Sequence, residues 1–207
     1  MFISFEGPEG SGKTTQARRL AETLTTEGHE VILVYEPGGT SIGKAIRGLL
    51  LSPEEAPNER TEALLFAAAR AQLVEEVIRP SLSRGAIVIS DRFSDSTIAY
   101  QVGGRGLPRE MVERLTAFAT AGIKPDLTFL LDVETTTGFA RKRQTTPDRM
   151  ERADLDFHER VRNAYLQLAK SEPERIVRLD ATRPAPELAQ QILELVRAKL
   201  SREPAGT

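Results

Sequence analysis

Short apolar segments alternate with longer, mostly amphipathic ones along the chain. The short segments are rich in β-branched and other apolar residues, which predicts strands at Ile3–Phe5, Val31–Val34, Ala86–Ile89, Leu127–Leu131 and Arg175–Leu179. The longer segments predict helices at Lys13–Glu27, Thr61–Arg79, Arg109–Ala121, Thr135–Arg143, Leu155–Lys170 and Pro186–Leu200. Gly28 and Pro80 are expected to end the first two of these helices.

The strands are apolar throughout rather than alternating, as a parallel sheet that is covered on both faces requires. Together with the succession of strand and helix, this predicts an α/β fold in which a doubly wound, parallel five-stranded sheet is flanked by helices. Ligands of such sheets bind outside the carboxyl ends of the strands. With 207 residues, the chain is expected to form one domain over about 1–200, followed by a frayed tail at 201–207.

The composition narrows the range of functions. The 28 lysines and arginines and 30 aspartates and glutamates give a formal net charge of −2, which argues against a nucleic-acid partner. The chain has no cysteine and two histidines, so a thiolate or histidine metal site is not expected. No apolar run approaches the roughly 20 residues that span a bilayer, and the first residues do not resemble a signal peptide. We therefore expect a cytoplasmic protein without a membrane partner.

A glycine-rich motif carries the strongest chemical signal. The motif, Gly7 to Thr14, fits G-x-x-x-x-G-K-[ST] and lies between a predicted strand and a predicted helix, as a P-loop requires. Its glycines let successive backbone N–H groups point at an anion, and the positive end of the following helix adds attraction. The sequence therefore predicts a P-loop NTPase type of fold in which ATP is bound by Gly7, Pro8, Glu9, Gly10, Ser11, Gly12, Lys13, Thr14 and Thr15.

Two residues are candidate magnesium ligands. The Thr14 hydroxyl occupies the position that ligates Mg²⁺ in P-loops, and Lys13 beside it is expected to reach the β- and γ-phosphates. Asp91 follows the predicted strand Ala86–Ile89, as a Walker B aspartate does. An aspartate at the end of a strand can also cap a helix, so the metal assignment of Asp91 depends on the P-loop.

The arginines favour one class of P-loop protein. The chain lacks the Asn-Lys-x-Asp segment that reads guanine in GTPases, and a motor ATPase usually needs a longer chain. A small-molecule kinase instead needs a second anion site and mobile cations near the transferred group. Residues 141–152 carry five cations and are interpreted as a lid, the alternative being a solvated helix end with ordinary ion pairs. The cations of this segment are Arg141, Lys142, Arg143, Arg149 and Arg152.

Several further segments, taken in order and with their spacing, resemble bacterial thymidylate kinases (dTMP kinases) over nearly the whole chain. They are Glu6-Gly-Pro-Glu-Gly-Ser-Gly-Lys-Thr-Thr15, Glu36-Pro-Gly-Gly-Thr40, Ile46-Arg-Gly-Leu-Leu-Leu51, Leu65-Phe-Ala-Ala-Ala-Arg70, Asp91-Arg92 with Tyr100, Gly103-Gly-Arg-Gly106, Pro125-Asp-Leu127, Leu131-Asp132 and Asp148-Arg149. The resemblance implies phosphorylation of dTMP to dTDP with ATP and Mg²⁺ for dTTP synthesis. It also implies a homodimer, in which the helix Thr61–Arg79 could form the interface.

The resemblance implies roles for individual residues. Glu9 lies near the acceptor sugar in this family, and Arg47 and Arg92 hold the acceptor phosphate. Phe66 stacks on thymine, and Arg70 forms hydrogen bonds with the edge of the base. The spacing of four puts Phe66 and Arg70 on one helical face. The alternative for Phe66 is a core residue, because it also belongs to an apolar stripe of that helix.

Two more acceptor-side roles follow from the resemblance. Thr97 is expected to face the base, and Tyr100 to exclude ribonucleotides by occupying the place of a 2′-hydroxyl. The alternative for Tyr100 is a tyrosine that closes the core. The rival functions are a kinase for another nucleoside monophosphate or deoxynucleoside, and a non-catalytic ATP-binding switch.

The chain departs from the family pattern at two places. Tyr35 stands where many relatives carry arginine before Glu-Pro-Gly-Gly-Thr, and 144–147 read Gln-Thr-Thr-Pro where many bacterial members have Arg-Gly. The P-loop contains no cation besides Lys13, so the lid is expected to supply further positive charge through Arg143 or Arg149. The expected catalytic residues are Lys13, Arg92, Arg149, Arg143 and Glu9.

Overall fold

One parallel sheet of five strands forms the centre of the protein. The computed structural model describes residues 1–52, 54, 57–142 and 148–201. The strand order is β2-β3-β1-β4-β5, with β1 at Phe2–Glu6, β2 at Val31–Tyr35, β3 at Ile87–Asp91, β4 at Leu127–Asp132 and β5 at Ile176–Asp180. All neighbouring pairs are parallel, and the chain builds outward from the central β1 in both directions. The predicted doubly wound α/β sheet is confirmed, and each strand differs from its predicted bounds by two residues at most.

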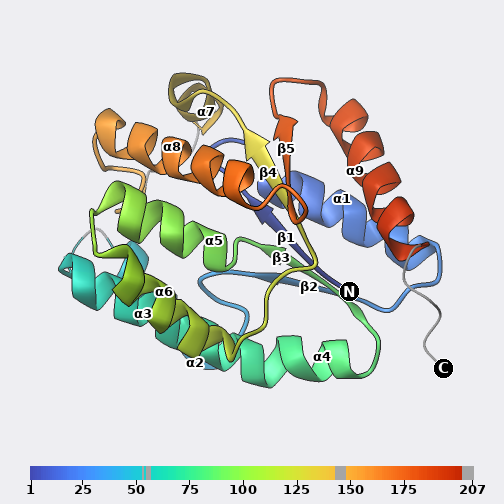
Figure 1. The fold of residues 1–207 in the computed structure, drawn as a ribbon, viewed down its shortest axis with the longest axis horizontal. Helices are drawn as coiled ribbons and strands as arrows, with labels where there is room; N and C mark the ends of the chain where they lie inside the picture. Colours follow the sequence, from blue (N-terminus) through green and yellow to red (C-terminus); the bar gives the residue numbers. More distant parts are fainter. Residues whose placement is uncertain (53, 55–56, 143–147, 202–207) are drawn as a thin grey trace.

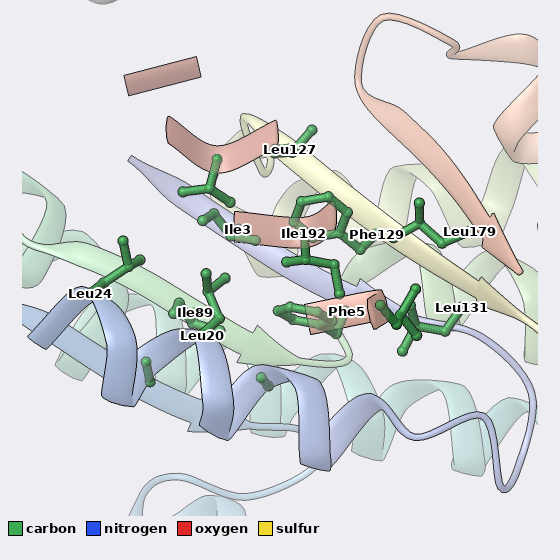
Figure 2. Close-up of a cluster of buried hydrophobic side chains, with 14 of the residues drawn as sticks. Ile3, Phe5, Leu20, Leu24, Ile89, Leu127, Phe129, Leu131, Leu179 and Ile192 are labelled. Carbon is green, nitrogen blue, oxygen red and sulfur yellow. The ribbon is translucent and has the colours of Figure 1, made fainter. Parts of the chain in front are cut away.

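Helices α1 (Lys13–Thr26) and α9 (Ala185–Leu200) cover one face of the sheet (Figure 1). Between them and the strands lies a core of aliphatic and aromatic side chains that come from both helices and from four strands (Figure 2). Its labelled members are Ile3, Phe5, Leu20, Leu24, Ile89, Leu127, Phe129, Leu131, Leu179 and Ile192. This packing fixes the start of α1, and hence the P-loop, against the end of β1.

The opposite face is covered by a larger set of helices. They are α3 (Glu59–Leu73), the π-helical segment η1 (Val74–Ile78), α4 (Arg79–Ser83), α5 (Ser94–Thr97), the π-helical segment η2 (Ile98–Gly104) and α8 (Leu155–Ser171), with α2 (Ser41–Leu51) and α6 (Arg109–Thr120) packed against α3. Helix α7 (Thr135–Lys142) follows β4 and lies against the P-loop and α8. Alternate residues of a strand point to opposite faces. Phe5 therefore packs in the core on the α1 side, and Phe2 packs beneath η1.

Two helical segments were not among the predicted elements, α2 and the continuous run α5–η2. Helix α2 contains two glycines, which weaken helix propensity and so obscure its pattern. The overlooked signal is Thr40, whose Oγ1 accepts a hydrogen bond from Gly43 N at 2.9 Å and caps the helix. Both segments carry expected acceptor-side residues: α2 contains Arg47, and α5–η2 contains Thr97 and Tyr100.

The prediction that the long helix ends at Pro80 is wrong. The chain remains helical through η1 and α4 to Ser83, with Pro80 in the first turn of α4. Proline is tolerated there because the π-helical segment just before it already interrupts the regular i to i−4 hydrogen bonding. The expected lid is only partly covered: α7 includes Arg141 and Lys142, while Arg143 and the rest of 143–147 lie outside the described residues, as do residues 202–207.

Candidate active site

The P-loop leaves the end of β1 and enters α1. Gly7 and Gly10 both have positive φ angles, 138° and 69°. A Cβ on Gly10 would lie 2.0 Å from the carbonyl oxygen of Gly138, and one on Gly7 would lie 2.3 Å from that of Leu131. Glycine is therefore required twice, for the backbone angle and for the close approach of α7 and of the β4 end. Helix α7, which carries the first lid residues, therefore packs directly against the loop.

The Lys13 ammonium lies over the P-loop. It donates to the carbonyl oxygens of Pro8 at 2.8 Å and Gly7 at 3.1 Å, and to Ser11 Oγ at 3.3 Å. Burial, followed by the nearby charge of Arg92, lowers the pKa of Lys13 to about 8. A bound phosphate would oppose this shift by placing negative charge beside the ammonium.

Thr14 and Asp91, the expected metal ligands, lie in direct contact. The Thr14 hydroxyl in the first turn of α1 donates to the carboxylate of Asp91 at the end of β3. Carboxylate and hydroxyl oxygens suit Mg²⁺, which usually takes few protein ligands and completes its shell with phosphate oxygens and water. Among the described residues there is no cluster of three or more acidic, histidine or cysteine side chains that could hold a metal. The pair fits a nucleotide-bound Mg²⁺ better than a metal site built from protein alone.

A cavity of about 580 Å³ opens at the carboxyl ends of β1, β2 and β3. Thirteen of the residues expected from the sequence line it: Glu9, Gly10, Gly12, Lys13, Thr14, Thr15, Arg47, Phe66, Arg70, Asp91, Arg92, Thr97 and Tyr100. Gly7, Pro8 and Ser11 contribute oxygens that hold Lys13 instead. The P-loop and the expected acceptor side therefore share one cavity.

Arg92, Glu9 and Tyr100 form a charged cluster beside the P-loop. Arg92 pairs with the Glu9 carboxylate, and its guanidinium carbon lies 5.2 Å from the centre of the Tyr100 ring. The Tyr100 hydroxyl donates to the same carboxylate oxygen at 2.9 Å. Burial alone would raise the pKa of Glu9, but Arg92, Lys13 and Lys142 together hold it well below its usual range. Glu9 is therefore ionised at neutral pH and can accept hydrogen bonds only.

The Arg70 guanidinium is buried at the other end of the cavity. Its Nε donates to Glu36 Oε2 at 2.7 Å, one terminal nitrogen to Thr97 Oγ1 at 2.6 Å and the other to the Phe93 carbonyl at 3.1 Å. These contacts fix its plane relative to the cavity wall. Phe66, one turn earlier on α3, is only half-buried and lines the cavity, so the alternative of a core residue is wrong.

Arg47 and Tyr35 meet at the cavity wall nearest to β2. The Arg47 guanidinium carbon lies 5.7 Å from the centre of the Tyr35 ring, and one terminal nitrogen donates to the Pro37 carbonyl at 2.9 Å. A guanidinium against an aromatic face gains a cation–π attraction. Tyr35, which the sequence marked only as a departure from the family, thus supports Arg47.

Two of the lid cations, Lys142 and Arg149, lie at different sites. Lys142 at the end of α7 donates to Glu9 Oε2 at 2.8 Å and also pairs with Glu151. Arg149 lies elsewhere: it donates to Glu62 Oε2 at 2.7 Å and to the Leu50 carbonyl at 2.8 Å, and it does not line the cavity. Lys142 is thus the described lid cation that contacts the P-loop carboxylate.

Sequence reasoning missed several residues of this site. Lys142 was named as part of the basic cluster, but nothing in the sequence distinguished it from the neighbouring arginines. Glu36 belongs to a segment that resembles the family, yet its partnership with Arg70 joins positions that lie 34 residues apart. Glu6 begins the first segment that resembles the family, but nothing in the sequence indicated that it forms a buried group with Ser96 and Tyr165 behind Arg92.

Comparison with known proteins agrees with this geometry. A sequence model of the thymidylate kinase family matches residues 5–192. The chain is 49% identical to a thymidylate kinase of Deinococcus radiodurans over 193 residues, which cover 93% of this chain and 94% of the relative. It is 48% identical to a thymidylate kinase of Pseudomonas fluorescens (strain Pf0-1), with 95% and 94% covered.

A solved structure agrees as well. The crystal structure of thymidylate kinase from Ehrlichia chaffeensis matches with a TM-score of 0.78 and 34% sequence identity, covering 95% of this chain and 98% of that one. The match therefore spans nearly the whole fold. The chain belongs to the thymidylate kinase family.

Proposed function

We propose that this protein transfers the γ-phosphoryl group of ATP to the phosphate of dTMP, with Mg²⁺ as the metal, and so supplies dTDP for dTTP synthesis. One observation carries the proposal: the P-loop, the Arg92–Glu9–Tyr100 cluster and the Phe66–Arg70 pair line a single cavity. Thymidylate kinases are phosphotransferases, so the class of reaction follows from the family.

On the donor side, the P-loop N–H groups and Lys13 bind the β- and γ-phosphates. Thr14 and Asp91 would hold Mg²⁺, which neutralises phosphate charge when it is bound. The hydrogen bond between these two side chains supports this assignment, because it brings two hard oxygen donors together at the start of α1.

On the acceptor side, Arg92 and Arg47 bind the dTMP phosphate. Its oxygen is already nucleophilic, so no covalent enzyme intermediate is needed and the protein mainly aligns the two phosphates and screens their charge. Ionised Glu9 accepts a hydrogen bond from the 3′-hydroxyl of the sugar and keeps Arg92 at the P-loop edge. A planar guanidinium matches two phosphate oxygens at once, which favours arginine at these positions.

Thymine lies between the aromatic face of Phe66 and the polar edge made by Arg70 and Thr97. Support comes from the fixed orientation of the Arg70 guanidinium, which is set by Glu36, Thr97 and the Phe93 carbonyl. A polar edge that is held in place rejects bases whose donors and acceptors do not match, because buried groups would then be unpaired.

Lys142 supplies positive charge from the lid, together with Arg143 of the segment that follows. Its contact with Glu9 supports this role, since it brings the ammonium to the edge of the P-loop. Arg149 supports the lid from the acceptor side through Glu62. A cation that approaches the transferred group neutralises charge that develops in the transition state.

The protein is further proposed to be a homodimer that associates through α2, α3 and α6. These helices pack in that order and expose large apolar side chains. The side chains are Ile42, Leu49, Leu64, Met111 and Phe118, with Phe118 85% exposed. Exposed apolar residues on neighbouring helices are typical of an interface between protein chains.

An acceptor screen tests the function. Purified protein with ATP–Mg²⁺ is given dTMP, dUMP, UMP, CMP, AMP or GMP, and ADP release is measured. Turnover should require an acceptor, be highest with dTMP and stop when EDTA is in excess over magnesium. Lys13→Ala should lower kcat at least about 10²-fold, which identifies the activity with this P-loop. Highest turnover with another monophosphate would favour the rival kinase, and ADP release without any acceptor would favour the ATP-binding switch.

A further inference from the structure

The backbone of Arg92 adopts an unusual conformation. Its φ angle is 71°, a left-handed value that residues other than glycine rarely take. Three contacts hold this turn: Arg92 N donates to the Phe5 carbonyl at 2.9 Å, Ser90 Oγ donates to the Arg92 carbonyl at 2.6 Å, and Phe93 N donates to Glu6 Oε1 at 2.7 Å. A strained conformation persists only where its surroundings enforce it. Two of the three contacts come from the end of β1.

Glu6 is a buried carboxylate that the proposed mechanism does not use. Its side chain lies at the end of β1, next to the first P-loop residue, and the residue is 1% exposed. Oε1 binds the Phe93 N–H, and Oε2 accepts from Ser96 Oγ at 2.6 Å and from the Tyr165 hydroxyl at 3.1 Å. None of the ion pairs among the described residues includes Glu6. Burial and the nearby Asp95 raise the pKa of Glu6 to about 7, so at pH 8 it is mostly ionised and accepts hydrogen bonds only.

The two hydroxyls that bind Glu6 also contact the Arg92 guanidinium. One of its terminal nitrogens lies 3.3 Å from the Tyr165 hydroxyl oxygen and 3.4 Å from Ser96 Oγ. The same nitrogen donates to the Gly7 carbonyl of the P-loop at 3.3 Å. The two hydroxyl oxygens also lie 2.7 Å apart, so their two protons are shared between the carboxylate and each other, and at least one goes to Glu6. Because the ionised carboxylate can only accept, lone pairs of Ser96 and Tyr165 remain to accept from Arg92. Tyr165 comes from α8, which packs beside α5 and η2 (Figure 1).

We propose that Glu6 is a positioning residue for phosphoryl transfer, which holds the backbone at Arg92 through the Phe93 N–H and the Arg92 guanidinium at the edge of the P-loop through Ser96 and Tyr165. The inference rests on the proposed function, since it needs Arg92 to bind the acceptor phosphate there. Glu6 thereby connects the end of β1, where the P-loop begins, to the arginine that binds the acceptor phosphate.

Glu6→Gln tests the polarity of this arrangement. Glutamine keeps the shape of the side chain and an oxygen for the Phe93 N–H, but its amide nitrogen donates where Oε2 accepted. The hydroxyl protons of Ser96 and Tyr165 would then turn toward the Arg92 guanidinium. At pH 8, kcat with dTMP should fall about tenfold to a hundredfold, the scale of a small misplacement of reacting groups. The KM for ATP should stay within about twofold of the wild-type value.

Tyr165→Phe and Ser96→Ala test the same inference without changing the buried charge. Each should lower kcat severalfold and leave the KM for ATP unchanged. Ser4→Ala is the matched control: Ser4 lies on β1 two residues before Glu6, is fully buried, and its hydroxyl contacts Thr128 Oγ1 at 2.8 Å. It should lose stability but keep the wild-type kcat, which separates loss of a buried polar contact from loss of positioning.

A double-mutant cycle with Arg92→Ala decides whether Glu6 acts through Arg92. If it does, adding Glu6→Gln to Arg92→Ala should change kcat by less than about twofold, because coupled residues are not additive. Multiplying effects would overturn the inference, as would wild-type kcat in Glu6→Gln and Tyr165→Phe. If Glu6→Gln does not fold, the double-mutant cycle is measured with Tyr165→Phe and Arg92→Ala instead, and the same two outcomes apply. A wild-type protein without dTMP-dependent turnover would overturn the proposed function first, and this inference with it.

Discussion

Three glutamates near the cavity, the buried Glu6 and Glu36 and the half-buried Glu9, differ in what surrounds each carboxylate. Glu9 has Arg92 and Lys142 in contact, so its pKa lies well below the usual range. Glu36 has Arg70, but burial outweighs that charge and raises its pKa. Glu6 binds backbone and hydroxyl groups, and burial raises its pKa to about 7. Glutamate therefore occurs here in three settings: paired with two cations in Glu9, paired with one buried arginine in Glu36, and bound to N–H and O–H groups in Glu6.

The raised pKa of Glu6 predicts how stability depends on pH. From its ordinary value of 4.5 up to about 7, the folded state keeps a proton that the unfolded state has lost. This group therefore makes the free energy of unfolding fall as pH rises through that range, by up to about 3 kcal/mol, and adds no change above it.

Glu6→Gln removes this dependence, so relative to wild type the variant should gain stability between pH 5 and pH 7.5. Urea denaturation at the two values measures the difference. If the free energy of unfolding changes equally in both proteins between pH 5 and pH 7.5, Glu6 is ionised over that whole range.

Replacing Arg70 should damage both base recognition and stability. Arg70→Ala leaves Glu36 buried without its partner, at a cost of about 3–5 kcal/mol of unfolding free energy. Adding Glu36→Gln should recover part of that loss, as urea denaturation would show. In folded protein, kcat/KM for dTMP should decrease by a factor that corresponds to about 1–3 kcal/mol of lost transition-state binding. The KM for ATP should change little. Equal losses for both substrates would contradict a role in reading the base.

Tyr100 belongs to the core and to the cavity at once, being 7% exposed with its hydroxyl on Glu9. Tyr100→Ala should narrow the kcat/KM ratio between dTMP and its 2′-hydroxy analogue by about tenfold or more, because a ring that blocks the extra oxygen is lost. Tyr100→Phe keeps the ring and should keep most of that ratio. If the alanine variant folds with its ratio unaltered, Tyr100 has no part in selecting the sugar.

At the scale of elements, α7 joins the lid to the P-loop. Gly138 of α7 and Gly10 of the loop come so close that a Cβ on either would overlap backbone of the other element. This contact fixes the direction in which α7 delivers Lys142. Arg149, on the far side of the lid, is instead tied to the buried Glu62 of α3, which also binds Arg105.

The two lid cations should therefore behave differently. Lys142→Ala should lower kcat by about 10²-fold and change the KM for dTMP less, as expected for a contact that strengthens in the transition state. Arg149→Ala should mainly lower stability, by about 1–3 kcal/mol, since Glu62 keeps Arg105. Lys170→Ala, on an exposed turn of α8, is the matched control. A crippled Arg149→Ala beside an active Lys142→Ala would make Arg149 the charge donor, as the sequence also allowed.

At the scale of the whole molecule, the apolar side chains that α2, α3 and α6 expose predict association. Phe118→Glu and Leu64→Glu should shift the sedimentation coefficient from a dimer toward a monomer, because a charge at the centre of an apolar interface would be buried without a partner. Ala198→Glu, an exposed position on α9 across the sheet, should leave the assembly unchanged. A wild-type monomer at micromolar concentration would contradict the proposed dimer.

The strands, the P-loop and the P-loop side of the cavity could be predicted from the sequence, because their signals are local. A strand, a glycine turn and a helix follow one another within about a dozen residues, and buried parallel strands show as apolar runs. The contact between Thr14 and Asp91 was also within reach, since the carboxyl ends of parallel strands meet at one edge. The resemblance to a family then supplied the acceptor-side residues.

The packing of separate elements was needed to distinguish residues of the same chemical type and to choose between two uses of one pattern. Phe66 fitted a core stripe and a cavity wall equally well, and packing alone showed that it is half-buried at the cavity. Lys142 and Arg149 lie in one basic segment, but in the folded chain Lys142 pairs with Glu9 and Arg149 pairs with Glu62. Glu6, Ser96 and Tyr165 meet across up to 159 residues of sequence, and no periodicity or motif encodes such a contact, because it depends on how separate elements pack.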